Sequence, residues 1–256
     1  MADKIASIST GAIKSTVKYT DRSAYEGVID DQHRRQGEGM LATADETLYK
    51  GMFVDDKKCG YGVWKDKFGS KYDGMWSDDK ANGEGVFIYG PHSVYQGEWV
   101  NDEHHGKGRM SYEDGTTYEG DWVNGKRHGS GVLRRADGST HSGLFENGNI
   151  NGYGISEFSD GTVYEGSWKE NQKHGWGIMT KSNGAKYEGE FFKDERHGHG
   201  TYASADGKKY VGNWKNNTQH GEGIFFPVDN DKGRRGEWFE GQVKQWIDPA
   251  SDDEDD

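Results

Sequence analysis

The chain has 256 residues, of which 31% are hydrophobic, and its formal net charge at pH 7 is −12. Such a balance usually leaves too little apolar surface to offset the entropy lost on ordering, and by itself it indicates disorder. The 9 Trp, 14 Tyr and 10 Phe, with 40 Gly and only 3 Pro, instead favour a sheet packed through aromatic rings. The low apolar content argues against a deep two-layer core, and the acidic excess argues against nucleic-acid binding.

Cysteine content and the N-terminal residues indicate the cellular compartment. Cys59 is the sole cysteine, which excludes an intramolecular disulfide and fits a reducing environment. The opening residues, Met-Ala-Asp-Lys-Ile-Ala-Ser, lack the apolar core of a signal peptide, and no stretch is long and apolar enough to span a membrane. We therefore expect a soluble cytoplasmic protein.

The first predicted element belongs to an N-terminal segment, residues 1–24. Within it, residues 14–19 are predicted to form the second strand of an incomplete hairpin. A repeat array needs atypical terminal units, so this half-hairpin is expected to cap the first repeat.

Residues 25–233 are predicted to form nine tandem repeats. The pattern Tyr-x-Gly-x-(Trp/Phe) recurs with a step of 23 residues from Tyr49 to Tyr210, and Gly-x-Gly begins eleven residues after each leading position. A fixed period of this length indicates a repeat architecture. The repeat-defining residues are Tyr72, Tyr95, Tyr118, Tyr164, Tyr187 and Tyr210, with Gly74, Gly97, Gly120, Gly166, Gly189 and Gly212.

Turn residues predict that each repeat is a β-hairpin. Asn124-Gly125 lies between the two landmarks of one repeat, and Asp114-Gly115 lies between one repeat and the next. Both dipeptides favour a type I′ turn, whose two central residues have positive φ. Nine such hairpins predict an all-β fold, an elongated single-layer antiparallel sheet in the form of a twisted ribbon.

Side-chain alternation predicts how the rings pack. Tyr118, Gly120 and Trp122 point to one face of their strand. A glycine flanked by rings leaves a slot across which a neighbouring ring can lie. The strand glycines are therefore interpreted as packing slots.

The segment from Tyr118 to Gly131, Tyr-Glu-Gly-Asp-Trp-Val-Asn-Gly-Lys-Arg-His-Gly-Ser-Gly, resembles the MORN repeat, whose pattern is close to YEGEWxNGKxHGxG. Residues 187–200 match nearly as well, and the likeness covers about residues 25–241. The chain departs from the pattern where Ile29 replaces a Trp and where His141 and Arg234 each replace a Tyr. We expect weaker ring packing at these positions.

The array is predicted to close after the ninth repeat. Residues 234–247 form a degenerate closing repeat or hairpin, and residues 248–256 are an acidic tail. The tail is interpreted as solvated disorder that protects the sheet edge, with an acidic docking segment as the alternative.

Two residue patterns resemble metal-binding sites, but neither is predicted to bind a metal ion. Asp229, Asp231 and Glu240 occupy three positions of a calcium loop, but Arg234 stands where glycine is required. Five recurring histidines would lie roughly 10 Å apart, too far to share one zinc ion. They are His105, His128, His174, His197 and His220.

The candidate binding site is a stripe of tryptophans at one equivalent repeat position. A single-layer sheet cannot bury both faces, so the stripe could form an exposed groove for a partner helix or extended segment. The alternative interpretation is that intramolecular stacking occupies the rings. The stripe contains Trp76, Trp99, Trp122, Trp168 and Trp214.

These observations predict a non-catalytic scaffold for protein partners, without cofactor or metal. No phosphate loop, HExxH or GxSxG motif is present. The resemblance implies a cytoskeletal assembly, in particular the axoneme of cilia and flagella, where repeat-only members occur in radial spoke heads. Homo-oligomers through the sheet edges are a further hypothesis. The alternative function is phosphoinositide or membrane-surface binding, which net acidity disfavours.

Overall fold

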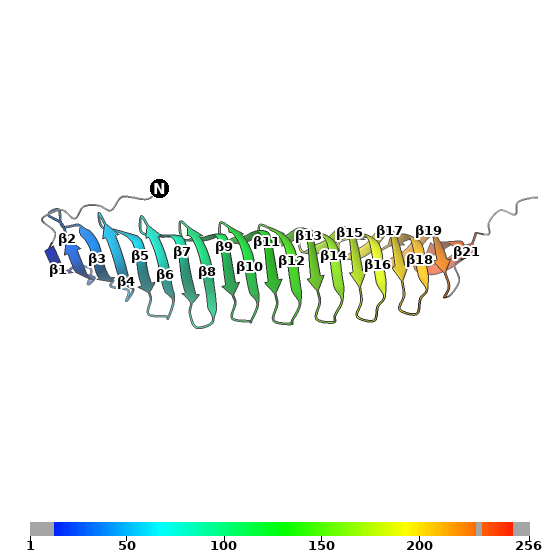
Figure 1. The fold of residues 1–256 in the computed structure, drawn as a ribbon, viewed down its shortest axis with the longest axis horizontal. Coiled ribbons are helices and arrows are strands. Elements are labelled where there is room, and N and C mark those ends of the chain that lie inside the picture. The colour runs from blue at the N-terminus through cyan, green and yellow to red at the C-terminus, as the bar shows by residue number, and fades with distance from the viewer. Residues whose placement is uncertain (1–12, 229–231, 248–256) are drawn as a thin grey trace, which may run out of the picture. The chain divides into compact units, whose positions relative to one another are not determined.

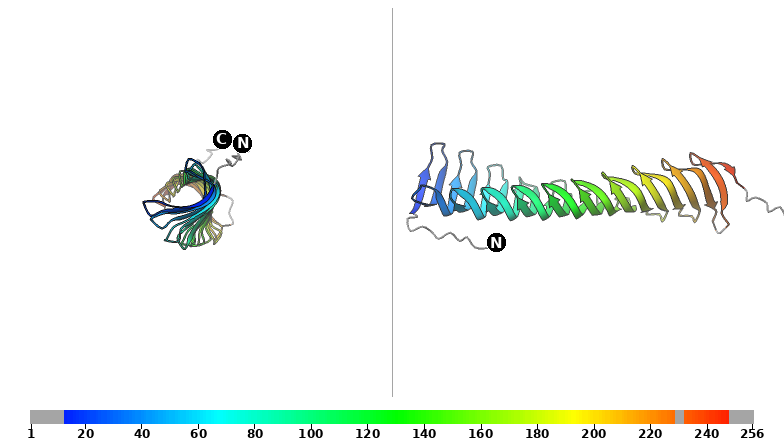
Figure 2. Two further views of the ribbon diagram at one scale, coloured as in Figure 1. Left: turned by 90° about the vertical axis from the view of Figure 1, so that its left-hand side faces the viewer. Right: turned by 90° about the horizontal axis from the view of Figure 1, so that it is seen from above.

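The computed structural model describes residues 13–228 and 232–247, in which all regular structure is β-strand. The predicted antiparallel sheet of hairpins is confirmed. No helix in these two ranges has the length and apolar character needed to cross a membrane. The chain divides into two units after Arg127, and each unit is a single layer in which strands follow one another in chain order (Figures 1 and 2).

The first unit is an antiparallel meander in which each strand pairs with the next along the chain. Its strands are β1 (Ile13–Lys18), β2 (Ala24–Ile29), β3 (Arg35–Ala42), β4 (Leu48–Val54), β5 (Lys57–Lys65), β6 (Lys71–Ser77), β7 (Lys80–Tyr89), β8 (Ser93–Val100), β9 (Glu103–Ser111) and β10 (Thr117–Val123).

The second unit repeats the same meander, and β11 (Lys126–Arg134) contains the boundary between the units. The remaining strands are β12 (Thr140–Glu146), β13 (Asn149–Glu157), β14 (Val163–Lys169), β15 (Gln172–Thr180), β16 (Lys186–Phe192), β17 (Glu195–Ala203), β18 (Lys209–Lys215), β19 (Thr218–Phe226), β20 (Arg234–Phe239) and β21 (Gln242–Trp246).

The ends of the described chain are hairpin strands. β1 pairs with β2, where the capping strand was expected, and β20 pairs with β21, where a closing hairpin was expected. Asp229 and Asp231 of the discounted calcium loop lie outside the described residues, as does the acidic tail at 248–256.

The two kinds of turn differ in geometry. At Asn124-Gly125 the φ angles are 49° and 73°, as a type I′ turn requires. Asp114-Gly115 instead lies in a longer loop closed by a hydrogen bond of 2.8 Å from the Tyr112 amide to the Thr116 carbonyl, and there only Gly115 has positive φ. The type I′ prediction is therefore wrong for the loops between repeats.

A row of paired glycines crosses each unit. Gly74 faces Gly85 on the next strand, and Gly85 faces Gly97 on the strand after that. A Cβ atom at Gly74 or Gly85 would lie within 3 Å of the Tyr72 side chain, so these glycines are packing slots, as the sequence suggested. The first glycine of each Gly-x-Gly has a different role, because it adopts a positive φ. Gly83, for example, has a φ of 93° and lies beside a β-bulge.

Candidate functional site

The tryptophans of the candidate stripe lie in a column of rings on the face that carries the leading tyrosines, here called the tyrosine face. Trp99 packs edge-to-face between Tyr95 and Tyr72, with centroid distances of 5.1 and 5.3 Å. Its Nε1–H donates to the Gly85 carbonyl at 3.3 Å. At most 9% of each side chain is exposed in Trp76, Trp99, Trp122, Trp168 and Trp214.

An exposed aromatic groove is therefore wrong for these five tryptophans, because each indole is covered by the leading rings of its own and the preceding hairpin, which are tyrosines except for His141 beside Trp168. Intramolecular stacking, the other interpretation, accounts for their position. Edge-to-face pairs contribute about 0.5–1.5 kcal/mol each beyond burial, so the column is a main source of stability in a sheet without a second layer.

The repeat-defining tyrosines are almost fully buried, and each hydroxyl forms a hydrogen bond with the backbone of its own strand. The Tyr72 hydroxyl donates to the Met75 carbonyl at 2.9 Å, and the bond recurs at the equivalent positions. Burial raises the pKa of Tyr210 to about 12. The members are Tyr72, Tyr95, Tyr118, Tyr164, Tyr187 and Tyr210. Their glycine partners Gly74, Gly97, Gly120, Gly166, Gly189 and Gly212 lie in the glycine row.

Cationic side chains cover the outer edge of the ring column. The Lys58 Nζ lies 4.7 Å from the Trp76 ring centroid, and the Arg196 guanidinium lies 4.4 Å from that of Trp214. Desolvation lowers the pKa of both cations. These cation–π contacts, which were not predicted from the sequence, leave little of the aromatic surface to a partner.

Three of the five recurring histidines pack beside phenylalanine rings. His174 and His197 lie 5.2 and 5.8 Å from the Phe192 ring, and His220 lies 5.4 Å from Phe239. In the described part of the chain, no group of three or more His, Cys, Asp or Glu side chains could hold a metal ion.

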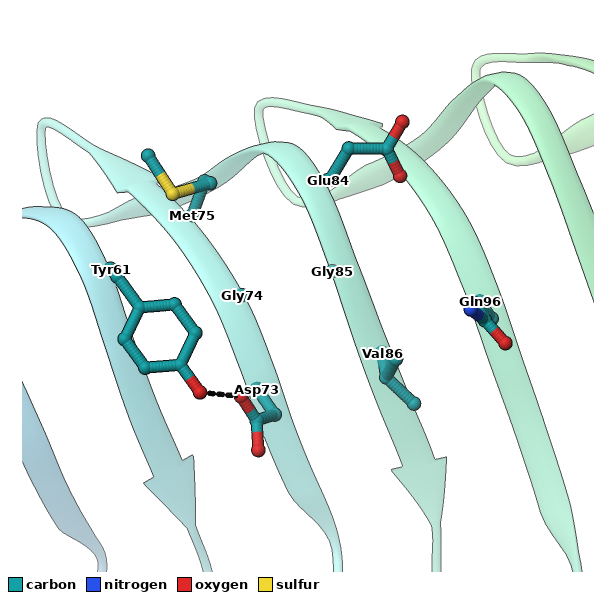
Figure 3. Close-up of a pocket in the computed structure, with 8 residues that line it drawn as sticks. All are labelled: Tyr61, Asp73, Gly74, Met75, Glu84, Gly85, Val86 and Gln96. Atoms are coloured by element: carbon teal, nitrogen blue, oxygen red, sulfur yellow. Dashed lines mark hydrogen bonds between the residues drawn. The ribbon is translucent and has the colours of Figure 1, made fainter.

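The opposite side of the sheet, here called the open face, carries large exposed side chains. Figure 3 shows Tyr61, Asp73 and Met75 projecting on this side from β5 and β6, with Val86 on β7 beside them. The Tyr61 ring is 57% exposed, and its hydroxyl donates to the Asp73 carboxylate. Apolar and acidic groups are thus both available to a partner here.

The second unit presents an equivalent surface. Tyr153 on β13 is 55% exposed, and its hydroxyl donates to Glu165 at 2.6 Å. Leu144 on β12, Ile155 on β13 and Trp176 on β15 are exposed as well. This patch also combines apolar side chains with a carboxylate.

Shallow hollows flank both exposed tyrosines. One, of about 330 Å³, extends from Tyr61 past Gly74 and Gly85 to Gln96 (Figure 3). The other, of about 470 Å³, lies between Val132 and Tyr153. Both hollows are lined in part by glycines of the row, Gly74 and Gly85 in the first unit and Gly131 and Gly143 in the second.

These exposed residues were not predicted, although the sequence contains a signal for them. Tyr61, Tyr153 and Trp176 each occupy the middle of a Gly-x-Gly landmark, where Glu84, Lys107 and Ser130 stand in other repeats. A large ring between two glycines cannot share their face, because strand side chains alternate. An aromatic residue in the middle of a Gly-x-Gly landmark therefore predicts a ring on the open face.

The fold and its two faces define a class of protein: a tandem β-hairpin repeat protein with one face used for internal packing and the other available for binding. The family model described as the MORN repeat matches residues 49–67, 72–94, 95–117, 118–140, 141–163, 164–186, 187–209 and 210–229. The chain belongs to the MORN-repeat family.

Other comparisons add little. No curated protein matches the sequence significantly. Among solved structures, the TCP10 domain of Danio rerio CPAP is 7% identical, with a TM-score of 0.42 over 78% of this chain and 94% of that one. The Drosophila melanogaster SAS-4 TCP domain, solved with a proline-rich motif of Ana2, is 12% identical, with a TM-score of 0.34 over 84% and 99%. At these scores the likenesses carry no argument about function.

Proposed function

We propose that this protein is a non-catalytic scaffold that binds protein partners through its open face. The observation that carries the proposal is the exposed cluster around Tyr61 and its equivalent around Tyr153, set beside shallow hollows. Exposed aromatic side chains with satisfied hydroxyls are typical of protein-binding surfaces. The tyrosine face, by contrast, is occupied by its own rings and cations.

The proposed setting is a cytoskeletal assembly, most specifically the axoneme of a cilium or flagellum. Support comes from the repeat content of the chain, since nearly all of residues 25–247 is used by repeats and short repeat-only members of the family are typical of axonemes. Association of copies through the terminal strands β1 and β21 is a further part of this proposal.

Affinity purification of the tagged chain from its native cells, followed by mass spectrometry, tests the scaffold. We expect stable co-purification of cytoskeletal proteins that survives nonionic detergent. Replacing Tyr61 and Tyr153 together by serine should reduce that recovery. Recovery of the chain without protein partners would contradict a scaffold, and recovery of membrane-junction proteins or lipid kinases would contradict the axonemal setting.

Membrane-surface binding is a second candidate, favoured by the loop between β5 and β6. Phe68 at this loop is 77% exposed, and Lys67 lies over its ring at 5.5 Å. Lys65 and Lys71 flank the loop in sequence. An exposed ring beside lysines is suited to an anionic lipid surface.

Flotation with vesicles containing phosphatidylserine and phosphoinositide at physiological salt separates the two functions. Strong flotation that Phe68→Ser abolishes would favour membrane attachment. We expect the chain to stay at the bottom of the gradient.

A further inference from the structure

The exposed patches of the two units are equivalent in the repeat. Tyr153 follows Tyr61 by 92 residues, which is four repeats of 23. The same offset relates Met52 to Leu144 and Asp73 to Glu165. Each tyrosine hydroxyl binds the carboxylate at the matching position. The chain therefore carries the same surface twice, once in each unit.

Each patch can be defined by an open-face row across six strands. In the first unit the cross-strand row alternates between apolar residues on β3, β5 and β7 and polar residues on β4, β6 and β8. In the second unit β11, β13 and β15 supply the apolar residues. The rows are Met40, Lys50, Val63, Asp73, Val86 and Gln96, and Val132, Ser142, Ile155, Glu165, Ile178 and Glu188.

A second row of three cross-strand pairs runs beside each first row. It contains the exposed rings and the other carboxylates of the patch. Its members are Glu38, Met52, Tyr61, Met75, Glu84 and Glu98 in the first unit, and Ser130, Leu144, Tyr153, Ser167, Trp176 and Glu190 in the second. Each pair of rows is called a station below.

Polar residues end each apolar series. The position that carries Val86 in one repeat carries Arg109 in the next, and Arg109 is exposed. Likewise Thr201 follows Ile178. The apolar series therefore spans three hairpins in each unit and does not continue along the whole array.

Charge and spacing indicate what a station binds. The first station holds four carboxylates and one lysine, and the second holds three carboxylates and no lysine or arginine. Lys71 pairs with Asp73 at 2.7 Å and Lys186 pairs with Glu188 at 3.1 Å, which leaves each station a net charge of about −2. A basic segment is thus complementary to both stations.

The spacing of the apolar side chains indicates the conformation of that segment. Apolar side chains on alternate strands lie about 9.6 Å apart, close to the roughly 10.5 Å that seven residues span in an α-helix.

An extended segment fits less well, because about three residues span this distance and successive contacts would then fall on opposite sides of the strand. A helix with apolar residues seven apart keeps all of them on one side. The width of the three hairpins, measured across their strands, matches the length of a helix of about 15–18 residues.

We infer that the two stations each bind one basic amphipathic helix, so that the scaffold holds two copies of the same partner segment. This inference rests on the proposed scaffold function and adds the chemistry and the number of its partner segments.

The test uses the full chain and a synthetic helical peptide of about 18 residues, with Leu at heptad spacing and Lys at the flanking positions. Isothermal titration calorimetry should give two peptides per chain. Tyr61→Ser and Tyr153→Ser should each weaken one site by about tenfold or more, so that the number of peptides bound falls to one, and the double variant should bind none at concentrations that saturate the wild type.

Three controls make the result specific. Phe68→Ser removes a more exposed ring outside both stations and should leave two sites. A Leu/Glu peptide of the same pattern should not bind, and an alternating Leu-Lys peptide that favours a strand should bind at least about tenfold more weakly. Glu84→Gln and Glu188→Gln should weaken the first and second sites respectively.

The inference of two helix-binding stations would be overturned by a single site in the wild type or by unchanged stoichiometry in both serine variants. Binding of either control peptide as tight as that of the Leu/Lys helix would overturn it too. The scaffold itself would survive that outcome if native partners still co-purify with the wild type. Absence of native partners would instead contradict the scaffold, whatever the peptide does.

Discussion

The tyrosine position of the repeat combines three tasks in one side chain. Its ring covers the glycines of its own and the next strand, its edges stack on neighbouring rings, and its hydroxyl satisfies a backbone carbonyl. His141 occupies this position in one repeat and is completely buried. It contacts Phe145 and Trp168 at centroid distances of 5.3 and 5.4 Å, so the ring column continues through it.

The shorter imidazole cannot reproduce the tyrosine hydrogen bond. His141 Nδ1 lies 2.8 Å from Ser156 Oγ, whereas its Nε2 is buried without a partner. We expect His141→Tyr to raise the free energy of unfolding by about 1 kcal/mol, because the hydroxyl would reach the Leu144 carbonyl. Urea unfolding followed by tryptophan fluorescence measures this. His141→Phe, which lacks the hydroxyl, should gain less, and an equal gain would contradict the hydrogen-bond explanation.

The same histidine makes stability depend on pH. Burial, with a smaller effect of Arg135, lowers the pKa of His141 to about 4, below its ordinary 6.5. The unfolded chain therefore takes up a proton first, and this contribution to stability, present above pH 6.5, is lost as the pH falls towards 4. Between pH 7 and 5 the loss should be about 2 kcal/mol. His141→Tyr should show a smaller difference between urea midpoints at these two values, and an unchanged difference would assign the effect elsewhere.

At the scale of the element, the tight turns connect each hairpin to the one before it. The amide of Asp79 donates to the Lys58 carbonyl at 3.2 Å, and its Oδ1 accepts from the Lys58 amide at 2.9 Å. The same reciprocal pair recurs, for example at Asp194 with Lys173. An Asp or Asn at the second turn position thus both tolerates positive φ and ties successive repeats together.

Asp79→Ala should lower the free energy of unfolding by about 1 kcal/mol more than Asp78→Ala. Both residues have positive φ, so alanine causes similar backbone strain at either position. Asp79 accepts from a backbone amide of the preceding hairpin, whereas Asp78 makes an exposed ion pair with Lys57 at 2.9 Å, which contributes little to stability. Chemical denaturation of the two variants measures the difference. Asp79→Asn keeps the acceptor and should restore stability; no restoration would show that charge, and not the hydrogen bond, is what matters.

At the scale of the whole molecule, the strands of each unit pair with their chain neighbours, so contacts are local in sequence. Stability in such an array is close to a sum over repeats and their interfaces. Damage to one hairpin should therefore spread only to adjacent hairpins, and a single two-state transition is not expected.

Gly85→Val tests this, because its side chain would collide with the Tyr72 ring. Hydrogen exchange measured by mass spectrometry should show faster exchange in β6–β8 and unchanged protection in β16–β19. Tyr61→Ser, a nearby open-face change, should leave both segments protected. Equal loss of protection in both segments would indicate one cooperative unit and contradict the local model.

Much of this architecture is encoded locally and could be predicted from the sequence. The 23-residue step, the Asn124-Gly125 turn and the glycine slots follow from φ preferences and side-chain alternation, which act within a few residues. The same local rules misjudged Asp114-Gly115, because loop length and not the dipeptide alone decides the turn type.

The sequence by itself determined the repeat, its hairpins and the spacing of its rings, because these depend on residues close together along the chain. Only the tertiary structure decided which rings a partner could reach. Trp99 is covered by rings that come from two different hairpins, whereas Tyr61 projects from the open face beside a shallow hollow. Burial depends on neighbours brought together by strand pairing, and that information is absent from any single repeat.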